Sequence, residues 1–81
     1  MRQTTIGEYR VGITFNPSGD DTVTKIKTAA AALIDLIDGI QAPDPEIIRL
    51  KALAMTHIED AAMWGVKAAT KKPRQDDVTN A

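Results

Sequence analysis

Apolar residues recur every three or four positions over two long stretches of the chain, a spacing that predicts two amphipathic helices. The first stretch predicts a helix over residues 22–40, with a stripe formed by Val23, Ile26, Ala30, Leu33, Ile37 and Ile40. The second predicts a helix over residues 44–72 with two stripes, one of Ile47, Leu50, Ala54, Ala61 and Ala68, the other of Ile48, Met55, Ile58, Ala62 and Gly65. One partner helix covers only one stripe, so the second stripe predicts packing against further copies of the chain.

Turn and cap residues divide the rest of the chain. Asp44 followed by Pro45 and Glu46 is typical of a helix start, and Asn16-Pro17-Ser18-Gly19 predicts a turn before the first helix. Residues 11–15 alternate between apolar and polar positions without a partner strand, which favours an extended arm. The predicted fold is one all-α domain over residues 1–81, made of an extended arm and turn (1–21), an antiparallel hairpin of helices 22–40 and 44–72, and a polar tail (73–81).

Composition narrows the class of protein. The 81 residues are 43% apolar, with ten basic and eleven acidic side chains and a net charge of −1, which disfavours a generic DNA-binding protein. Chains of about 80 residues rarely gain more than ~3–5 kcal/mol from one core, and without cysteine this chain is expected to form a compact homo-oligomer. No apolar run approaches a membrane span. The N-terminus lacks the apolar core of a signal peptide, so a cytoplasmic location is expected.

The chemistry needed for catalysis is sparse. His57 is the only imidazole and is expected to be a partly buried or interfacial residue. Acidic residues occur as sequence neighbours, which diverge on a helix and do not form a catalytic pair. No Gly-rich nucleotide fingerprint is present, and the chain offers no set of ligands for a metal. The sequence therefore indicates a protein that is not an enzyme and needs no cofactor.

Binding residues gather around the predicted turn. An aromatic residue that can stack on a base stands before a turn and helix N-terminus whose free N–H groups suit an anion. Lysines and threonines follow one helical turn later. These residues predict a pocket for a phosphorylated, base-bearing small molecule, formed by Phe15, Asn16, Pro17, Ser18, Gly19, Thr24, Lys27 and Thr28, with Lys25 nearby. A core phenylalanine, an ordinary capping turn and solvated lysines would give the same pattern.

The end of the second helix carries a basic cluster formed by Lys67, Lys71, Lys72 and Arg74. The cluster either complements the helix dipole or forms a second anion site. Just before it, Met63 and Trp64 lie among small residues, which is typical of an oligomer interface or of a core tryptophan.

These residues resemble the second type of phage anti-CBASS protein, a cyclic-nucleotide sponge that shares a helical hairpin with a class of Thoeris inhibitors. The resemblance covers residues 11–71. It is carried by the aromatic turn Thr14-Phe15-Asn16-Pro17-Ser18-Gly19, the pair Ile26-Lys27, and Ile58-Glu59-Asp60-Ala61-Ala62-Met63-Trp64.

The resemblance implies a hexamer of helical hairpins in the host cytoplasm. It implies that cyclic dinucleotides such as 3′,3′-cGAMP, and in many members cyclic trinucleotides, are sequestered without being cleaved, so that CBASS effectors stay inactive. Phe15 would stack on a base, Lys27 would hold phosphate, and Lys67 and Lys71 would mark the trinucleotide site.

The chain departs from the family pattern at several positions. Phe15 replaces a more usual tyrosine, Lys27 and Lys71 stand where arginine is common, and Val66-Lys67 replaces Ala-Asn. Lysine gives up bidentate phosphate geometry, and the change at Val66-Lys67 falls at the trinucleotide site. The alternative hypothesis is a helical-hairpin module that binds a protein partner through its uncovered stripe and ignores nucleotides.

Overall fold

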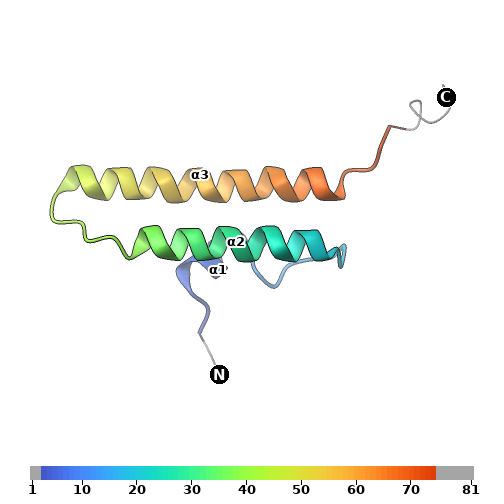
Figure 1. Ribbon diagram of the computed structural model, residues 1–81, viewed down its shortest axis with the longest axis horizontal. Coiled ribbons are helices and arrows are strands. Elements are labelled where there is room, and N and C mark those ends of the chain that lie inside the picture. Colours follow the sequence, from blue (N-terminus) through green and yellow to red (C-terminus); the bar gives the residue numbers. More distant parts are fainter. Residues whose placement is uncertain (1–2, 75–81) are drawn as a thin grey trace.

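The computed structural model describes residues 3–74, which form three helices and, within that range, no strand. Helix α1 spans Ile6–Val11, α2 spans Asp21–Asp38 and α3 spans Pro45–Thr70. Helices α2 and α3 run antiparallel as a hairpin (Figure 1). The two predicted helices are thus found, each with ends one or two residues from the expected positions. The predicted tail lies outside the described residues from residue 75 onward.

The expectation of an extended arm before the turn is wrong, because residues 6–11 form helix α1. A capping box starts this helix: Glu8 N donates to Thr5 Oγ1 at 3.1 Å, and Thr5 N donates to Glu8 Oε1 at 2.9 Å. Gly12 ends the helix in the left-handed conformation at φ 64°. The Thr-x-x-Glu spacing is a sequence signal for this start, and the apolar alternation after it belongs to a turn instead.

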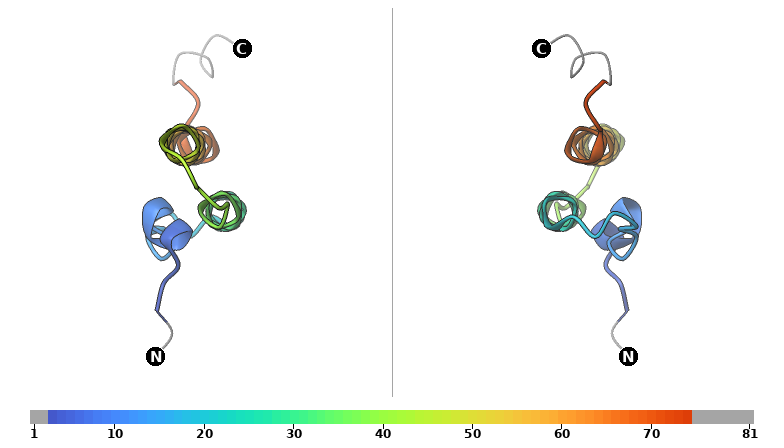
Figure 2. Two further views of the ribbon diagram at one scale, coloured as in Figure 1. Left: turned by 90° about the vertical axis from the view of Figure 1, so that its left-hand side faces the viewer. Right: turned by 90° about the vertical axis from the view of Figure 1, so that its right-hand side faces the viewer.

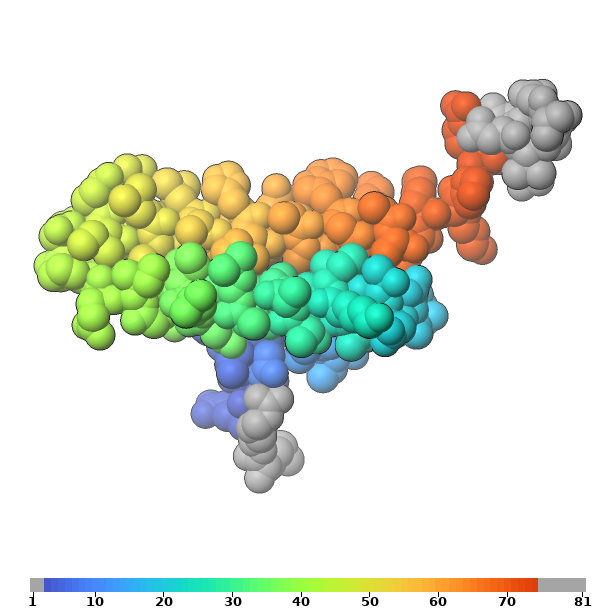
Figure 3. Space-filling model, viewed as in Figure 1, coloured from blue at the N-terminus to red at the C-terminus, as the bar shows by residue number. Residues whose placement is uncertain are grey.

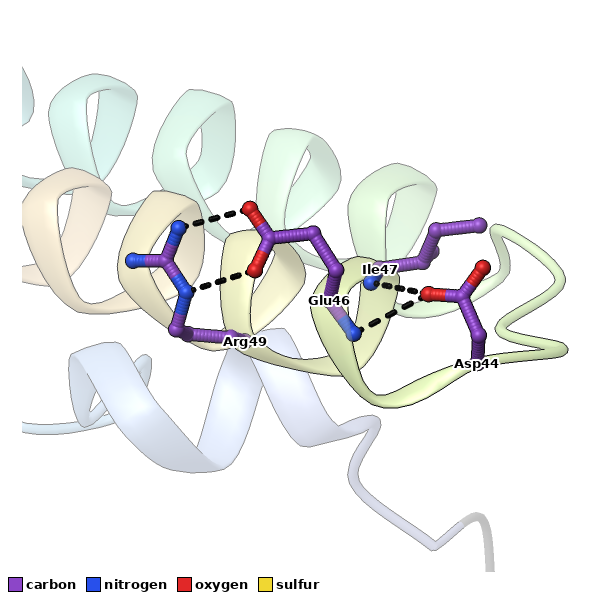
Figure 4. A network of polar contacts seen from close by, with 4 residues as sticks. All are labelled: Asp44, Glu46, Ile47 and Arg49. Atoms are coloured by element: carbon purple, nitrogen blue, oxygen red, sulfur yellow. Dashed lines mark hydrogen bonds and ion pairs between the residues drawn. The ribbon is translucent and has the colours of Figure 1, made fainter.

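Helix α3 starts as the sequence predicts. Asp44 Oδ1 accepts from Glu46 N at 3.0 Å and from Ile47 N at 3.1 Å, with Pro45 at the first helical position (Figure 4). Arg49 donates from Nε and Nη2 to the two Glu46 oxygens at 2.9 and 2.7 Å. These bonds lower the pKa of Glu46 and raise the pKa of Arg49. The start of α3 is therefore stabilised by its own local contacts.

Helix α1 packs closely on α2. Gly7 N donates to Asp35 Oδ1 at 2.7 Å, and a Cβ at Gly7 would lie 2.1 Å from the carbonyl oxygen of Ala31. Glycine is required here because the two backbones nearly touch. Seen end-on, α1 and α2 lie side by side and α3 lies above them (Figure 2). Among residues 3–74 the buried positions are few: Gly7, Val23, Lys27, Ala31, Ile34 and Ala62.

The hairpin covers one stripe of α3 more than the other, although Ile48 of the first is exposed and Ile47 and Ala54 of the second are half-buried. Ala62 is buried, Ile58 is half-buried, and a Cβ at Gly65 would lie 3.5 Å from Ile26. On the other stripe Leu50 is 50% exposed and Ala61 and Ala68 are exposed. Figure 3 shows α2 and α3 as two rods packed along their length. The hairpin alone therefore leaves an apolar face uncovered, and packing of this face against other copies stays a prediction. Among the described residues no helix is long and apolar enough to cross a membrane.

Candidate functional site

The turn between α1 and α2 is held by its own polar side chains. Ser18 Oγ donates to Asn16 Oδ1 at 2.7 Å, and Asn16 Nδ2 donates to Asp20 O at 3.0 Å and to Thr24 Oγ1 at 3.2 Å. Gly19 N donates to Asn16 O at 3.1 Å, and Gly19 adopts φ 67°. The turn is thus a closed network that fixes the residues before it.

The N-terminus of α2 is occupied by carboxylates of the chain. Asp20 is the N-cap and accepts from Thr22 N at 2.8 Å, and Asp21 pairs with Lys25 Nζ at 3.1 Å. Two negative charges at this end interact favourably with the helix dipole but repel an anion. The sequence predicts free N–H groups for an anion at this helix start, whereas the structure places carboxylates there.

Lys27 is buried beneath the turn, with a relative exposure of 8%. Its Nζ donates to Gly12 O at 3.0 Å and also to Phe15 O. The same Nζ lies 5.4 Å from the centroid of the Phe15 ring, within the range of a cation–π contact. Phe15 itself is 69% exposed, so its ring is presented to solvent rather than packed in a core.

Two adjoining grooves lie where the three helices meet. The smaller has a volume of about 190 Å³ and is lined by Phe15, Asn16, Pro17, Ser18, Val23, Lys27, Val66 and Thr70. The larger has a volume of about 420 Å³ and is lined by Arg10, Val11, Lys27, Thr56, Glu59, Asp60, Ala62, Met63 and Val66. Lys27 and Val66 line both grooves, so the two form one continuous surface. A volume of several hundred Å³ is typical of small-molecule sites.

The wall of the larger groove is tied together by Arg10. Its Nε donates to Glu59 Oε1 at 2.8 Å and its Nη2 donates to Thr56 Oγ1 at 3.3 Å, which joins α1 to α3. Two basic and two acidic side chains line this groove, so their formal charges cancel. An electrically balanced groove with an apolar floor suits an uncharged ring better than a phosphate.

The structure brings most of the predicted turn residues to one groove. Phe15, Asn16, Pro17, Ser18 and Lys27 line the smaller groove, and Thr24 supports it by accepting from Asn16. Gly19 closes the turn behind the groove, and Thr28 is exposed on α2. Neither of these two residues lines either groove. The alternative of a core phenylalanine is excluded by the exposure of Phe15.

The second set of predicted residues lies at the end of α3. Lys67 Nζ sits 5.3 Å from the Trp64 ring centroid, and Lys71 is the exposed C-cap. Met63 and Trp64 are 59% and 57% exposed, so Trp64 is not a core residue of the chain. Their place in an oligomer interface stays a prediction.

Sequence reasoning missed several residues of the two grooves. Val66 and Thr70 reach the turn because an antiparallel hairpin puts the end of α3 beside the start of α2, a pairing the sequence could have signalled. Arg10 reaches Glu59 only because residues 6–11 form a helix that docks on α2. That contact links positions 49 residues apart, and no local pattern reports it.

Metal and acid–base chemistry have little material in the described part of the chain. No group of three metal-ligating side chains is found among residues 3–74. His57 is exposed on α3, so it is not partly buried within the chain, and its place in an interface stays a prediction.

Comparison with known proteins gives one match. Residues 8–70 match the family model described as Acb2/Tad1, hairpin domain. No curated protein and no solved structure matches the chain. The matched range runs from α1 to the last residue of α3, and so includes the turn and both grooves.

Proposed function

Because the chain belongs to the Acb2/Tad1 hairpin-domain family, which supports an anti-defence role, we propose that it is a sponge for cyclic oligonucleotide messengers. It binds 3′,3′-cGAMP-like cyclic dinucleotides, with cyclic trinucleotides as the second ligand class, and does not cleave them. Sequestration lowers the free messenger concentration by mass action in the cytoplasm of the infected host, and CBASS effectors stay inactive.

The observation that carries this proposal is the exposed ring of Phe15 above a groove. A base stacked on an aromatic side chain gains about 1–3 kcal/mol, and every base has a face that can stack. The ring is 69% exposed, and the turn beneath it is closed by hydrogen bonds. A ring that is already fixed loses little entropy when a ligand binds.

The neighbouring surfaces suit the rest of such a ligand. The larger groove is charge-balanced and takes an uncharged portion, whereas Lys67 and Lys71 are exposed cations for phosphates or for a trinucleotide. A ligand with two bases needs two aromatic faces, and a symmetric assembly of copies supplies each residue twice. The uncovered apolar stripe of α3, with Met63 and Trp64, supports a homo-oligomer such as a hexamer.

Calorimetric titration with 3′,3′-cGAMP tests this function. Binding is expected near one ligand per two protomers, and denaturation followed by chromatography should recover the intact nucleotide. Phe15→Ala should weaken binding by about 1–3 kcal/mol with the fold retained. Tyr9→Ala is the matched control, because Tyr9 is also an exposed aromatic, at 76%, but lines neither groove. Equal affinity of the two variants would place the ligand elsewhere.

The alternative is a hairpin module that binds a protein partner. Exposed apolar side chains around the α2–α3 connection, such as Leu36 at 71%, favour it. A sponge should migrate as a closed oligomer in size-exclusion chromatography and bind nucleotides. An adaptor should migrate as a smaller species with no heat of binding for cyclic di- or trinucleotides.

A further inference from the structure

Lys27 differs from an ordinary phosphate-binding lysine. Its relative exposure is 8%, and its ammonium donates to two backbone carbonyls, Gly12 O and Phe15 O. A lysine that binds phosphate does so as a point charge, through the N–H donors of its ammonium. Here two of the three N–H donors are used inside the protein.

We propose that Lys27 is a positioning residue that acts on the ligand through Phe15 instead of holding phosphate. This inference rests on the proposed function of Phe15 as a base-stacking residue. The ammonium ties the end of α1 and the turn to α2 in one cluster, with the Phe15 ring centroid 5.4 Å away. The ring is thereby held at the mouth of the smaller groove.

The bonding of the turn supports this role. Gly12 O accepts both from Lys27 Nζ and from Phe15 N, the latter at 2.9 Å, so the ammonium and the turn share one acceptor. A Lys27 side chain that moved out to a phosphate would leave the Phe15 carbonyl without this donor. Loss of a partner at a partly buried carbonyl is unfavourable. The ammonium is therefore most stable where it holds the turn.

Lys25 provides the contrast on the same helix. It lies two residues away, its side chain is 76% exposed, and its ion pair with Asp21 at 3.1 Å is a surface contact. Replacing either lysine with methionine removes the same charge and keeps a side chain of similar length. Lys25→Met is therefore a matched control for long-range electrostatics.

A double-mutant cycle with 3′,3′-cGAMP separates the two roles of Lys27. Affinities of the wild type, Lys27→Met, Phe15→Ala and the double variant are measured by calorimetry at several salt concentrations. Lys27→Met should weaken binding about tenfold in the wild-type background, comparable to loss of one stacking contact. It should weaken binding less than about twofold in the Phe15→Ala background, because coupled residues are not additive. The salt dependence should match that of Lys25→Met.

The proposal would be overturned if Lys27→Met and Phe15→Ala lowered the affinity by independent factors and if Lys27→Met, but not Lys25→Met, weakened the salt dependence of binding. That result would indicate direct contact of Lys27 with phosphate. If Lys27→Met does not fold, the same double-mutant cycle is measured with Lys27→Gln. It removes the charge and keeps one hydrogen-bond donor group.

Hydrogen exchange tests, without any ligand, whether Lys27 holds the turn in place. The amide of Phe15, which donates to Gly12 O, should exchange faster in Lys27→Met than in Lys25→Met, whereas α3 amides should not change. Unchanged exchange at Phe15 would overturn the positioning role. If the wild type bound no cyclic nucleotide, the proposed function would fail, yet the exchange result would still decide whether Lys27 holds the turn.

Discussion

The two halves of the hairpin are packed differently. The three-helix region comprises α1, the turn at residues 12–20, residues 21–35 of α2 and residues 56–70 of α3. The hairpin tip comprises residues 36–55. Every buried residue of the described chain lies in the three-helix region, and none lies in the tip. Both regions expose large apolar side chains. The tip exposes Leu36, Ile40, Ile48, Leu50 and Leu53, and the three-helix region exposes, beside its core, Ile6, Tyr9, Phe15, Leu33, Met63 and Trp64.

The difference shows what a short third helix adds to a hairpin. Two helices alone bury one face of each partner, which is the state of the tip. In the three-helix region α1 covers a second face of α2, and residues such as Ile34 become inaccessible to solvent. The same docking brings Arg10 and the Phe15 turn to α3, so the core and the candidate site depend on one packing event.

The largest effect is expected for Ile34→Ala. Ile34 is 0% exposed, and such a truncation costs about 2–5 kcal/mol of unfolding free energy. Leu36→Ala, at a site 71% exposed, should change it by less than about 0.5 kcal/mol. Urea denaturation at two protein concentrations measures the change in unfolding free energy for both variants. A large effect of Leu36→Ala that depends on protein concentration would contradict the contrast between the two regions, because it would show that assembly buries the tip.

A smaller effect is expected for Gly7→Ala. The added Cβ would meet the Ala31 carbonyl oxygen at 2.1 Å, and overpacking of this kind costs about 1–3 kcal/mol. Gly39→Ala in the tip is the control, because its Cβ would meet no atom closer than 3.5 Å and its φ is −76°. That control should be stabilised by about 0.4–1 kcal/mol. Thermal unfolding of both variants measures these effects. Equal melting temperatures would contradict the close approach of α1 and α2.

Arg10→Met should have a modest effect. The ion pair with Glu59 has side chains 23% and 46% exposed, so solvent screening limits its loss to about 0.5–1 kcal/mol. The loss should shrink as salt is added. Arg49→Met, which breaks the more exposed pair with Glu46 in the tip, whose side chains are 58% and 61% exposed, is the control and should change the unfolding free energy less. The reverse order would mean that α1 is not held to α3 by this pair.

The smallest effect is expected for Glu46→Gln. Hydrogen bonds from Arg49 lower the pKa of the exposed Glu46 carboxyl in the folded state. The stabilisation is therefore present above the ordinary carboxyl pKa and is lost as pH falls through the lowered value. Melting curves of the variant and the wild type should differ slightly at neutral pH and coincide in acid. A difference that persists in acid would point to a role other than charge.

Local patterns allowed much of the fold to be predicted. The helical periodicity located α2 and α3, and Asp44-Pro45-Glu46 located the start of α3 to within one residue. The capping box of α1, Thr5 with Glu8, is a further local signal, at a place where the alternation that follows it led to the wrong prediction of an extended arm. The candidate site was predicted in part, since Phe15 and the turn are sequence neighbours, whereas Val66 and Thr70 come from the far end of the chain.

The two long helices and the aromatic residue beside a turn follow from spacing within a few residues, and the antiparallel pairing follows from the short connection between Asp38 and Pro45. The docking of α1 at Gly7, the carboxylates at the α2 start and the burial of Lys27 are visible only in the folded chain. The physical reason is that burial and hydrogen-bond partners are set by contacts between distant segments. A lysine looks the same in the sequence whether it faces solvent, as Lys25 does, or holds two carbonyls, as Lys27 does.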